Sequence, residues 1–356
     1  MRVGIALSGG VDSLYAAYCL IEEGHEVVGL HMRIRKDGED REEEEHLASR
    51  ARLIGINEVY TVDLQSEFHD RIVRPFVEAY LKGITPNPCV HCNPLIKFGL
   101  FAEIGFNLYG IERFATGHYA RIVPSPYRNG RFAVARGRDT KKDQSYFLFA
   151  LSQLQLVRTI FPLGRATKSE AKKWAKEYGF PDLAGKESQE ICFLGNRSYV
   201  DYIESIGLEK GNEGGPIKDL EGNVLGYHRG IHRFTIGQRR GIGIPSTEPY
   251  YVVRLDGATG TVYVGRRKDV YRRDCTVGRV VWGALEEPSE AFKAFVKIRQ
   301  QHIPAEGNII PCGQGTVRIT FREPQPAITP GQAAVFYDAD GVILGGGIIQ
   351  GGEEDQ

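Results

Sequence analysis

The sequence predicts an α/β protein, with a parallel-sheet domain followed by a small β-rich central domain and a C-terminal β-barrel. In the first half, short apolar runs alternate with helical stretches, which is the pattern of βαβ units and of a parallel sheet. After about Ile206, glycines and turn signals recur at the spacing of short strands, and from about Thr276 apolar and polar residues alternate between turns. We therefore expect domains over residues 1–205, 206–272 and 273–356.

The first domain is expected to begin with three pairs of a strand and a helix. The strands are expected at Val3–Leu7, Val27–Met32 and Val59–Leu64, and their helices at Leu14–Glu23, Glu42–Leu53 and Phe68–Leu81. The charged stretch Arg33–Glu45 predicts a solvated loop that leads into an exposed helix. Further along, Phe114–Tyr119 predicts a strand that runs into a glycine turn, the kind of edge where a base or ribose packs.

The second half is expected to consist of short strands. Turn signals such as Glu221–Asn223 and Asp256-Gly257 separate the strands of the central domain. Barrel strands are expected at Val277–Trp282, Ala294–Ile298, Thr316–Phe321 and Ala333–Tyr337. In the central domain a basic stretch interleaved with Phe234 and glycines predicts an RNA-facing hairpin; its residues are His228, Arg229, His232, Arg233, Arg239 and Arg240.

The composition supports folded domains and argues against a membrane protein. The chain has 356 residues, of which 42% are hydrophobic, enough for real cores. Basic and acidic residues both number 45, so only local patches of charge can indicate a nucleic-acid partner. No run of about 18 to 20 apolar residues is present, and the first ten residues lack the apolar core of a signal peptide. We expect a cytoplasmic protein without membrane association.

Ser8–Ser13, with the sequence SGGVDS, is expected to lie between the first strand and the first helix. Backbone N–H groups and the positive end of the helix dipole converge there on an anion. Gly9 and Gly10 let the backbone approach a phosphate closely, and Asp12 is placed to orient a phosphate-bound Mg²⁺. The loop contains no lysine, unlike the loops that grip the β- and γ-phosphates for γ-transfer. A plain strand-to-helix turn is the alternative interpretation.

Two cysteines stand three positions apart, Cys89 and Cys92, after a turn stiffened by prolines. Cys192 is distant in sequence, in a segment able to fold back over them. Three thiolates suit iron or zinc and leave one metal position open. Without an export signal a disulfide framework is not expected, although a Cys92–Cys192 disulfide fits an oxidised sample. A structural zinc, with His91 or His118 as fourth ligand, is the alternative.

Six segments recur in the same order in tRNA-specific 2-thiouridylases: SGGVDS, TPNPCVHCN with Lys97 and Phe98 following, ATGHYAR, KDQSYFL, ICFLG and TIGQRRGIGI. The chain resembles this family over nearly its whole length, and its first loop resembles that of the ATP-pyrophosphatase (PP-loop) superfamily. The resemblance implies that ATP with Mg²⁺ adenylates the carbon-2 oxygen of the wobble uridine of tRNA, which sulfur then replaces. It also implies that Cys92 is the nucleophile and that Cys192 carries a persulfide sulfur.

The same resemblance implies positions for ligand contacts. The expected ATP-binding residues are Ala6, Leu7, Ser8, Gly9, Gly10, Val11, Asp12 and Ser13, with Met32 and Gly117 against the adenine. The expected tRNA-binding residues, by family match or by their charge, are Arg138, Lys142, Asp143, Gln144, Arg239, Arg299 and Gln300.

One position departs from the family, because its better-known members have Asp where this chain has Cys89. A third thiol there resembles thiolases that hold a 4Fe-4S cluster on three cysteines, which are Cys89, Cys92 and Cys192 in this chain, with one iron free to bind sulfide. We favour this cluster over a persulfide relay, which needs no metal. The nucleophile is expected to be either a thiolate of lowered pKa or an iron-bound sulfide. The expected partners are tRNA and a sulfur donor, either inorganic sulfide or a persulfide carrier protein.

Two other functions compete with tRNA thiolation. A metabolite synthetase of the same superfamily would adenylate a small substrate, but its chemistry needs no CxxC pair. A non-catalytic RNA-binding protein with a structural zinc would bind tRNA without ATP.

Overall fold

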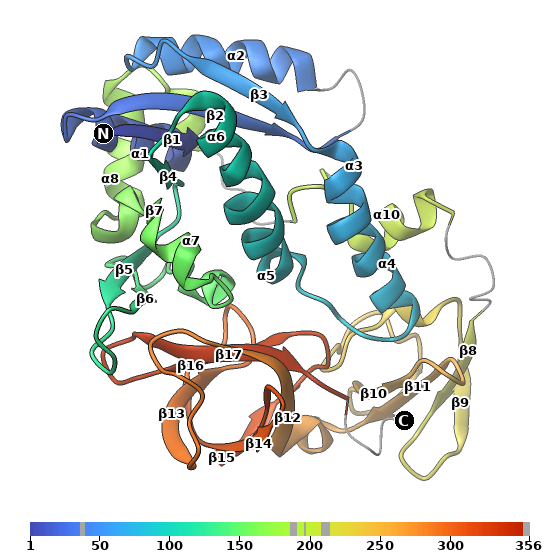
Figure 1. The fold of residues 1–356 in the computed structure, drawn as a ribbon. Helices are drawn as coiled ribbons and strands as arrows, with labels where there is room; N and C mark the ends of the chain where they lie inside the picture. The colour runs from blue at the N-terminus through green and yellow to red at the C-terminus, as the bar shows by residue number, and fades with distance from the viewer. Residues whose placement is uncertain (36–39, 186–190, 196, 208–213, 352–356) are drawn as a thin grey trace.

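The computed structural model describes residues 1–35, 40–185, 191–195, 197–207 and 214–351. A parallel sheet at the top of Figure 1 lies above two β-rich parts, a barrel and a smaller sheet beside it. Residues 36–39, within the expected loop Arg33–Glu45, and residues 186–190, 196, 208–213 and 352–356 lie outside the described residues. The predicted fold class is confirmed.

The parallel sheet is built from β1 (Arg2–Ala6), β2 (Glu26–Arg33), β3 (Val59–Asp63), β4 (Arg113–Ala115) and β7 (Thr159–Ile160). Its strand order is β3-β2-β1-β4-β7, so the chain moves outward in one direction from β1 and later returns to β1's other side. Open α/β sheets bind ligands outside the carboxyl ends of the strands at such a reversal. The reversal between β1 and β4 therefore marks the position of the nucleotide loop.

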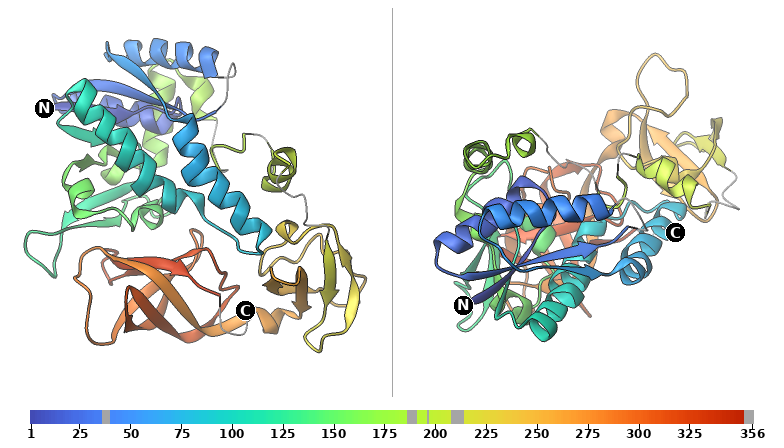
Figure 2. Two further views of the ribbon diagram at one scale, coloured as in Figure 1. Left: turned by 45° about the vertical axis from the view of Figure 1, so that its right-hand side comes forward. Right: turned by 90° about the horizontal axis from the view of Figure 1, so that it is seen from above.

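Helices cover both faces of this sheet. On one face lie α1 (Val11–Glu22), α2 (Asp40–Leu53) and α8 (Lys168–Glu177), which share one core with the β1 side chains Val3 and Ile5. The other face is covered by α3 (Gln65–Phe68), η1 (His69–Val73), α4 (Arg74–Leu81), α5 (Pro88–Cys92), η2 (Asn93–Phe101) and α6 (Ala102–Tyr109). Figures 1 and 2 show this second group running from the sheet toward the β-rich parts.

The remainder of the first part of the chain joins the sheet to the barrel. It contains the hairpin β5 (Ala120–Pro124) and β6 (Phe132–Arg136), then η3 (Ser145–Leu148), α7 (Gln153–Val157), η4 (Pro162–Arg165), α9 (Pro181–Ala184) and α10 (Tyr199–Ser205). The buried Tyr146 donates its hydroxyl hydrogen bond to the backbone carbonyl of Ala333 in the barrel, at 2.9 Å. Buried polar contacts of this kind fix the two parts in register, because an unpaired hydroxyl there would be costly.

The β-rich parts form two separate sheets. The smaller has the order β10-β11-β8-β9, from β8 (Gly215–Lys218), β9 (Val224–His228), β10 (Tyr251–Asp256) and β11 (Thr261–Gly265), with η5 (Ile231–Arg233) after β9 and η6 (Arg267–Val270) after β11. The closed barrel has the order β12-β15-β14-β13-β16-β17, from β12 (Tyr271–Trp282), β13 (Phe292–Lys297), β14 (Ala305–Gly313), β15 (Thr316–Pro326), β16 (Ala333–Tyr337) and β17 (Ile343–Ile349).

Two barrel strands were not predicted, β14 and β17. The glycine run of β17 weakens its strand signal, yet the barrel requires small residues there. A Cβ on Gly345 would lie 2.8 Å from the Trp282 ring, and one on Gly346 would lie 2.8 Å from the Phe149 ring. The glycines therefore let aromatic side chains close over the strand.

The basic stretch after His228 does not form the predicted hairpin. The chain leaves β9 at His228, makes the short η5 and continues through turns to β10. His228 and His232 are buried, and they bond to the Gly260 carbonyl at 2.8 Å and to the Glu204 carboxylate at 3.1 Å. His228, His232 and Phe234 of this basic and aromatic stretch are thus buried and pack the segment, whereas Arg239 stays exposed.

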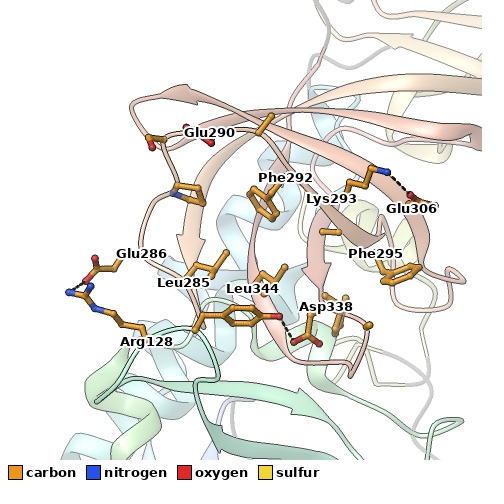
Figure 3. Close-up of a pocket in the computed structure, with 17 residues that line it drawn as sticks. Arg128, Leu285, Glu286, Glu290, Phe292, Lys293, Phe295, Glu306, Asp338 and Leu344 are labelled. Carbon is orange, nitrogen blue, oxygen red and sulfur yellow. Dashed lines mark hydrogen bonds and ion pairs between the residues drawn. The ribbon is translucent and has the colours of Figure 1, made fainter.

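A cavity of about 820 Å³ lies between the turn of the β5–β6 hairpin and the barrel (Figure 3). At its edge the Tyr127 hydroxyl donates to Asp338 at 2.8 Å, and Arg128 pairs with Glu286 at 3.1 Å. None of the cysteines and no residue of the SGGVDS loop lines it, so it belongs to the joint between hairpin and barrel. No helix within the described ranges is long and apolar enough to cross a membrane.

Candidate active site

The SGGVDS segment forms a tight loop between β1 and α1. Gly9 adopts φ +75°, a left-handed conformation that favours glycine. The Ser13 hydroxyl donates to the Gly10 carbonyl at 2.9 Å and accepts from the Ser8 backbone N–H at 3.2 Å, which closes the loop. Gly10 is the N-cap of α1, and within the described part of the chain no side chain caps the helix. The first N–H groups of α1 are thus left for an anion.

The Asp12 carboxylate forms contacts with two side chains, Tyr119 and Lys168, that its position in the loop does not predict. Its Oδ1 accepts a hydrogen bond from the Tyr119 hydroxyl at 2.7 Å. Both of its carboxylate oxygens also lie against the Lys168 Nζ, at 2.7 and 2.6 Å. Burial and the neighbouring Asp12 charge raise the pKa of Tyr119, so its hydroxyl remains a donor. Sequence reasoning missed Lys168 and Tyr119, and only the capping sequence Thr167–Glu170 marked the start of a helix there.

Gly117 is pressed against the same loop. A Cβ on this residue would lie 2.8 Å from the Asp12 carbonyl carbon and 2.9 Å from the Ser13 nitrogen. Only glycine lets the end of β4 approach the first turn of α1 this closely. Met32 precedes Arg33, the last residue of β2, at the same carboxyl edge of the sheet and packs partly buried against the neighbouring core. The two residues expected at the adenine therefore flank the loop from both neighbouring strands.

The CxxC pair begins a helix for local reasons. Asn87 is the N-cap, with its side-chain oxygen accepting from the Cys89 N–H at 3.2 Å, and Pro88 occupies the first helical position. Cys92 closes α5, where the chain passes into the π-helix η2, and is 8% exposed. The proline-rich turn thus directs both sulfurs inward from one short helix.

Cys192 is brought to the pair by its neighbour Phe193. The Phe193 ring packs 5.8 Å from Phe68 and 5.2 Å from Phe76, within the core that also contains Cys92. Cys192 itself remains exposed, and its carbonyl accepts from the Arg35 guanidinium at 3.0 Å. Cys192 acts to raise the pKa of both Cys89 and Cys92, so its segment lies near the CxxC helix, an arrangement that the sequence allows.

The three thiols share one electrostatic environment. Burial raises the pKa of Cys89 to about 11, with a further contribution from Cys192. Burial likewise raises the pKa of Cys92 to about 12, while Lys97, one turn further along η2, acts to lower it. The expectation of low-pKa thiols is therefore wrong for this state of the protein, because loss of hydration outweighs the lysine. Lys97 was not predicted as a site residue, although it lies in the TPNPC motif region.

The donor types suit a cluster, but the described side chains do not yet surround a metal. Among residues with described positions, no three His, Cys, Asp or Glu side chains form a group able to hold a metal ion. Burial and Lys97 lower the pKa of His118 well below its usual value, and its Nδ1 pairs with the Thr116 hydroxyl at 2.7 Å. Its ring contacts Phe98 and Phe161 at 5.9 and 6.0 Å. This is a satisfied structural histidine, and nothing here supports it as a zinc ligand.

A continuous series of contacts joins the two halves of the site. Gly117 touches the first turn of α1, and the next residue, His118, packs on Phe98. Phe98 follows Lys97 in η2. The Lys97 charge acts to lower the pKa of all three thiols, Cys89, Cys92 and Cys192. These contacts connect the SGGVDS loop to the surroundings of the cysteines through Gly117, His118 and Phe98.

Comparisons with known proteins agree with this architecture. Family models match residues 1–196 as a tRNA methyl transferase HUP domain, 203–266 as a tRNA methyl transferase PRC-barrel domain, and 272–349 as an aminomethyltransferase beta-barrel domain. The chain is 42% identical over 360 residues to tRNA-specific 2-thiouridylase MnmA 1 of Caldanaerobacter subterraneus subsp. tengcongensis, covering 98% of both chains. It belongs to the tRNA-specific 2-thiouridylase family.

Other relatives extend the comparison. The 2-thiouridylase MnmA of Chlorobium luteolum is 42% identical over 358 residues, with 98% of this chain and 96% of that protein covered. Among solved structures, the U34-tRNA thiolase NcsA of Methanococcus maripaludis with its 4Fe-4S cluster superposes with a TM-score of 0.35 at 20% identity. That superposition covers 59% of this chain and 67% of the thiolase, and no conclusion about a cofactor follows from it.

The residues expected to contact tRNA differ in their availability. The Asp143 carboxylate is buried and accepts from the Gly137 and Ser145 N–H groups, both at 3.2 Å. Gln300 donates to the Asp143 carbonyl at 2.6 Å, and Gln144 accepts from the Tyr119 N–H at 3.0 Å. These three side chains hold the segment in place, so we expect them to position rather than bind RNA.

The cationic residues of this predicted set are more open. Arg138 and Arg239 are exposed, and Lys142 and Arg299 are partly buried. Arg138 contacts Glu170 at 3.4 Å, and Arg299 donates to the Pro326 carbonyl at 3.0 Å. Exposed guanidinium groups bind phosphate oxygens with two parallel hydrogen bonds. A substitution of the exposed Arg239 is therefore the most direct test of the expected tRNA contacts.

Alkylation should rise with pH at the CxxC pair of this family member. A thiol reacts as its thiolate, whose fraction grows about tenfold per pH unit below the pKa. Since the pKa of Cys89 is raised to about 11, we expect its alkylation rate by iodoacetamide to keep rising between pH 7 and 10. Timed alkylation followed by peptide mass spectrometry measures this, with the exposed Cys312 as an internal reference. A Cys89 rate that levels off below pH 9 would contradict the raised pKa.

Proposed function

We propose that this protein is a tRNA-uridine 2-sulfurtransferase that acts on the wobble uridine and uses ATP to activate it. The observation that carries the proposal is the continuous site, in which a loop built for phosphates adjoins a cluster of three thiols. Family membership supports tRNA thiolation, and the PP-loop fold supports use of ATP. We place the reaction in the cytoplasm, with tRNA and a sulfur donor as partners.

The proposed chemistry has two steps. The carbon-2 oxygen of uridine attacks the α-phosphorus of ATP, and the bond to the β-phosphate oxygen breaks, so pyrophosphate leaves with the electron pair. Sulfide then attacks carbon 2, and the carbon–oxygen bond breaks to release AMP. In the persulfide form the terminal sulfur of the Cys192 persulfide attacks instead, and the Cys92 thiolate cleaves the sulfur–sulfur bond, which leaves a Cys92–Cys192 disulfide that a thiol reductant must reduce. Adenylation converts a poor leaving group into a good one, and the uncapped N–H groups of α1 stabilise the phosphate charge. Mg²⁺ bound to the phosphates would neutralise further charge.

Sulfur delivery belongs to Cys89, Cys92 and Cys192 in this proposal. Their donor types suit a 4Fe-4S cluster, which would supply an open iron for sulfide, whereas a persulfide relay would use Cys92 and Cys192 alone. Among the residues that the structure describes, the three thiols do not form a group able to hold a metal ion, so the cluster form depends on the reconstitution test. Anaerobic reconstitution with iron and sulfide separates the two forms. Equal amounts of bound iron and acid-labile sulfide support the cluster. A protein that binds no iron and no acid-labile sulfide supports the relay.

Nucleoside mass spectrometry tests the overall function. Unmodified tRNA is incubated anaerobically with the protein, ATP, Mg²⁺ and inorganic sulfide, with and without a persulfide carrier. Formation of 2-thiouridine together with AMP is expected. If AMP forms only with a small metabolite in place of tRNA, the metabolite synthetase is the better explanation. If tRNA binds equally well without ATP and is never thiolated, the better explanation is a non-catalytic RNA-binding protein.

Replacing Arg239 by alanine should weaken tRNA binding without affecting ATP. The exposed guanidinium is expected to contact one phosphate, so the slope of log affinity against log salt should fall by about one unit. Affinity for unmodified tRNA is measured at several salt concentrations by fluorescence anisotropy. The matched control is Lys293→Ala, on the barrel beside the cavity. It removes the charge of a lysine whose side chain is 81% exposed. Equal losses in both variants would mean that the effect is one of overall charge.

A further inference from the structure

A cluster of unpaired cations lies where the small sheet joins the barrel. The run Arg266–Arg273 passes from the end of β11 through η6 into β12 (Figure 1). Four of its side chains are exposed and form no hydrogen bond or ion pair with the residues that the structure describes: Arg267, Lys268, Arg272 and Arg273. We call these four side chains the joint cations. The whole chain has equal numbers of basic and acidic residues, so this excess of positive charge is local.

The acidic residues of the same stretch are engaged in other contacts. Asp269 accepts from the Arg266 backbone N–H at 2.7 Å and so caps η6. Asp274 accepts from the Thr320 hydroxyl at 2.6 Å and pairs with Arg318 at 3.7 Å. Within the described part of the chain neither carboxylate pairs with a joint cation. The cluster therefore presents its positive charge to solvent.

Two of the joint cations line a surface hollow of about 580 Å³. Its lining consists of Arg267, Lys268, Tyr271, Glu323 and Pro324, from η6, β12 and β15. Glu323 is the single carboxylate of this lining, so its net charge is positive. Tyr271 is 40% exposed and places an aromatic ring beside the two cations. This combination suits RNA, because guanidinium and ammonium groups bind its phosphates and an aromatic ring packs against its bases.

The hollow adjoins the residues that we expect to contact tRNA. Strand β12 pairs with β15 at Pro326, whose carbonyl also accepts from the Arg299 guanidinium at 3.0 Å. The next residue, Ala327, packs on the loop that carries Arg239, since a Cβ on Gly237 would lie 2.6 Å from the Ala327 Cβ. Two neighbouring residues at the end of β15 therefore touch β12, Arg299 and the loop of Arg239. The joint cations extend the region of these two expected contacts.

We propose, on the basis of the tRNA thiolation inferred above, that the joint cations bind the phosphate backbone of tRNA away from the wobble uridine. The uridine must reach thiols that lie in α5 and after α9, whereas the joint cations belong to η6 and β12. The phosphates at the joint cations are therefore those of other nucleotides. Each cation that neutralises a phosphate releases counterions, so this contact favours binding most at low salt.

The test compares two double variants that each remove two exposed cations. Arg267→Ala with Lys268→Ala removes the charges of the hollow, and Arg52→Ala with Lys176→Ala removes two charges from α2 and α8 in the first domain. Fluorescence anisotropy at several salt concentrations measures the affinity for unmodified full-length tRNA and for its isolated anticodon stem-loop.

The hollow variant is expected to bind full-length tRNA about 10- to 50-fold more weakly, with the slope of log affinity against log salt reduced by about one to two units. Its affinity for the stem-loop should change by less than about twofold, because the stem-loop lacks the nucleotides assigned to the joint cations. The control variant should match the unmodified protein with both RNAs. Thermal unfolding of the hollow variant should also be unchanged, since the replaced side chains are exposed and unpaired among the described residues.

Three outcomes overturn the inference. Equal weakening for both RNAs, or in both double variants, would mean a general attraction for polyanions. Unchanged affinity of the hollow variant for full-length tRNA would exclude the contact and favour an acidic protein as the partner of the joint cations. If the unmodified protein binds tRNA but never thiolates it, the proposed function fails while the affinity comparison still decides on the joint cations.

Discussion

Replacing Cys92 by serine should abolish tRNA thiolation while leaving ATP-dependent activation of tRNA intact. The loss of 2-thiouridine formation is expected to be at least about 1,000-fold, because a serine hydroxyl neither carries sulfur nor ligates iron. Pyrophosphate release in the presence of tRNA should persist, since the SGGVDS loop precedes α1 whereas Cys92 belongs to α5. Both products are measured in the same reaction, by mass spectrometry and by a pyrophosphate assay.

Cys275→Ser is the matched control for this substitution. Cys275 lies in β12 of the barrel, and burial raises the pKa of its thiol to about 12, as it does for Cys92. The chemical change and its desolvation cost are therefore similar, but the residue is far along the chain from the proposed site. Thiolation by Cys275→Ser should be normal. Thiolation that survives in Cys92→Ser would exclude this cysteine as the sulfur-transferring residue.

Replacing Gly117 by alanine should impair ATP binding more than any other single methyl group added at the sheet edge. The new Cβ would lie 2.8 to 2.9 Å from backbone atoms of Asp12 and Ser13, which cannot rotate away as a side chain does. The first turn of α1 must shift, at a cost of about 1 to 3 kcal/mol. If that cost falls on the bound state, affinity for ATP with Mg²⁺ drops about 10- to 100-fold.

Titration calorimetry and thermal unfolding together measure the Gly117→Ala effect. Gly185→Ala is a suitable control, because Gly185 has φ −89° and a Cβ there meets no atom of the described residues within 4 Å. That control should leave both affinity and unfolding temperature unchanged. Normal ATP affinity in Gly117→Ala would mean that the contact between β4 and α1 is not part of the nucleotide site.

Local sequence signals predicted the elements that carry the site. The strand before Ser8–Ser13 and the helix after it follow from an apolar run and from glycines suited to a turn. The α5 helix follows from Asn87 and Pro88, so the inward direction of Cys89 and Cys92 was already encoded within five residues. Such features depend on neighbours within one or two turns, which a single sequence displays.

The same signals failed where packing overrode them. The basic stretch after His228 has the charge of an RNA surface, but two of its histidines are buried in hydrogen bonds. The pKa of the Cys92 thiol is raised and not lowered. The sequence shows that Lys97 is close to Cys92, but it does not show the burial that outweighs the lysine. Composition reports which groups are present, whereas desolvation depends on what surrounds them.

By itself the sequence determined the fold class, the phosphate loop and the cysteine pair, because each rests on residues close together in the chain. Only the tertiary structure decided that Phe193 brings Cys192 over the pair, that Gly117 touches α1, and that Lys168 lies against Asp12. These contacts join residues separated by about a hundred positions or more. No local pattern specifies them, since they arise from the order of the parallel strands and the shared cores on the two sheet faces.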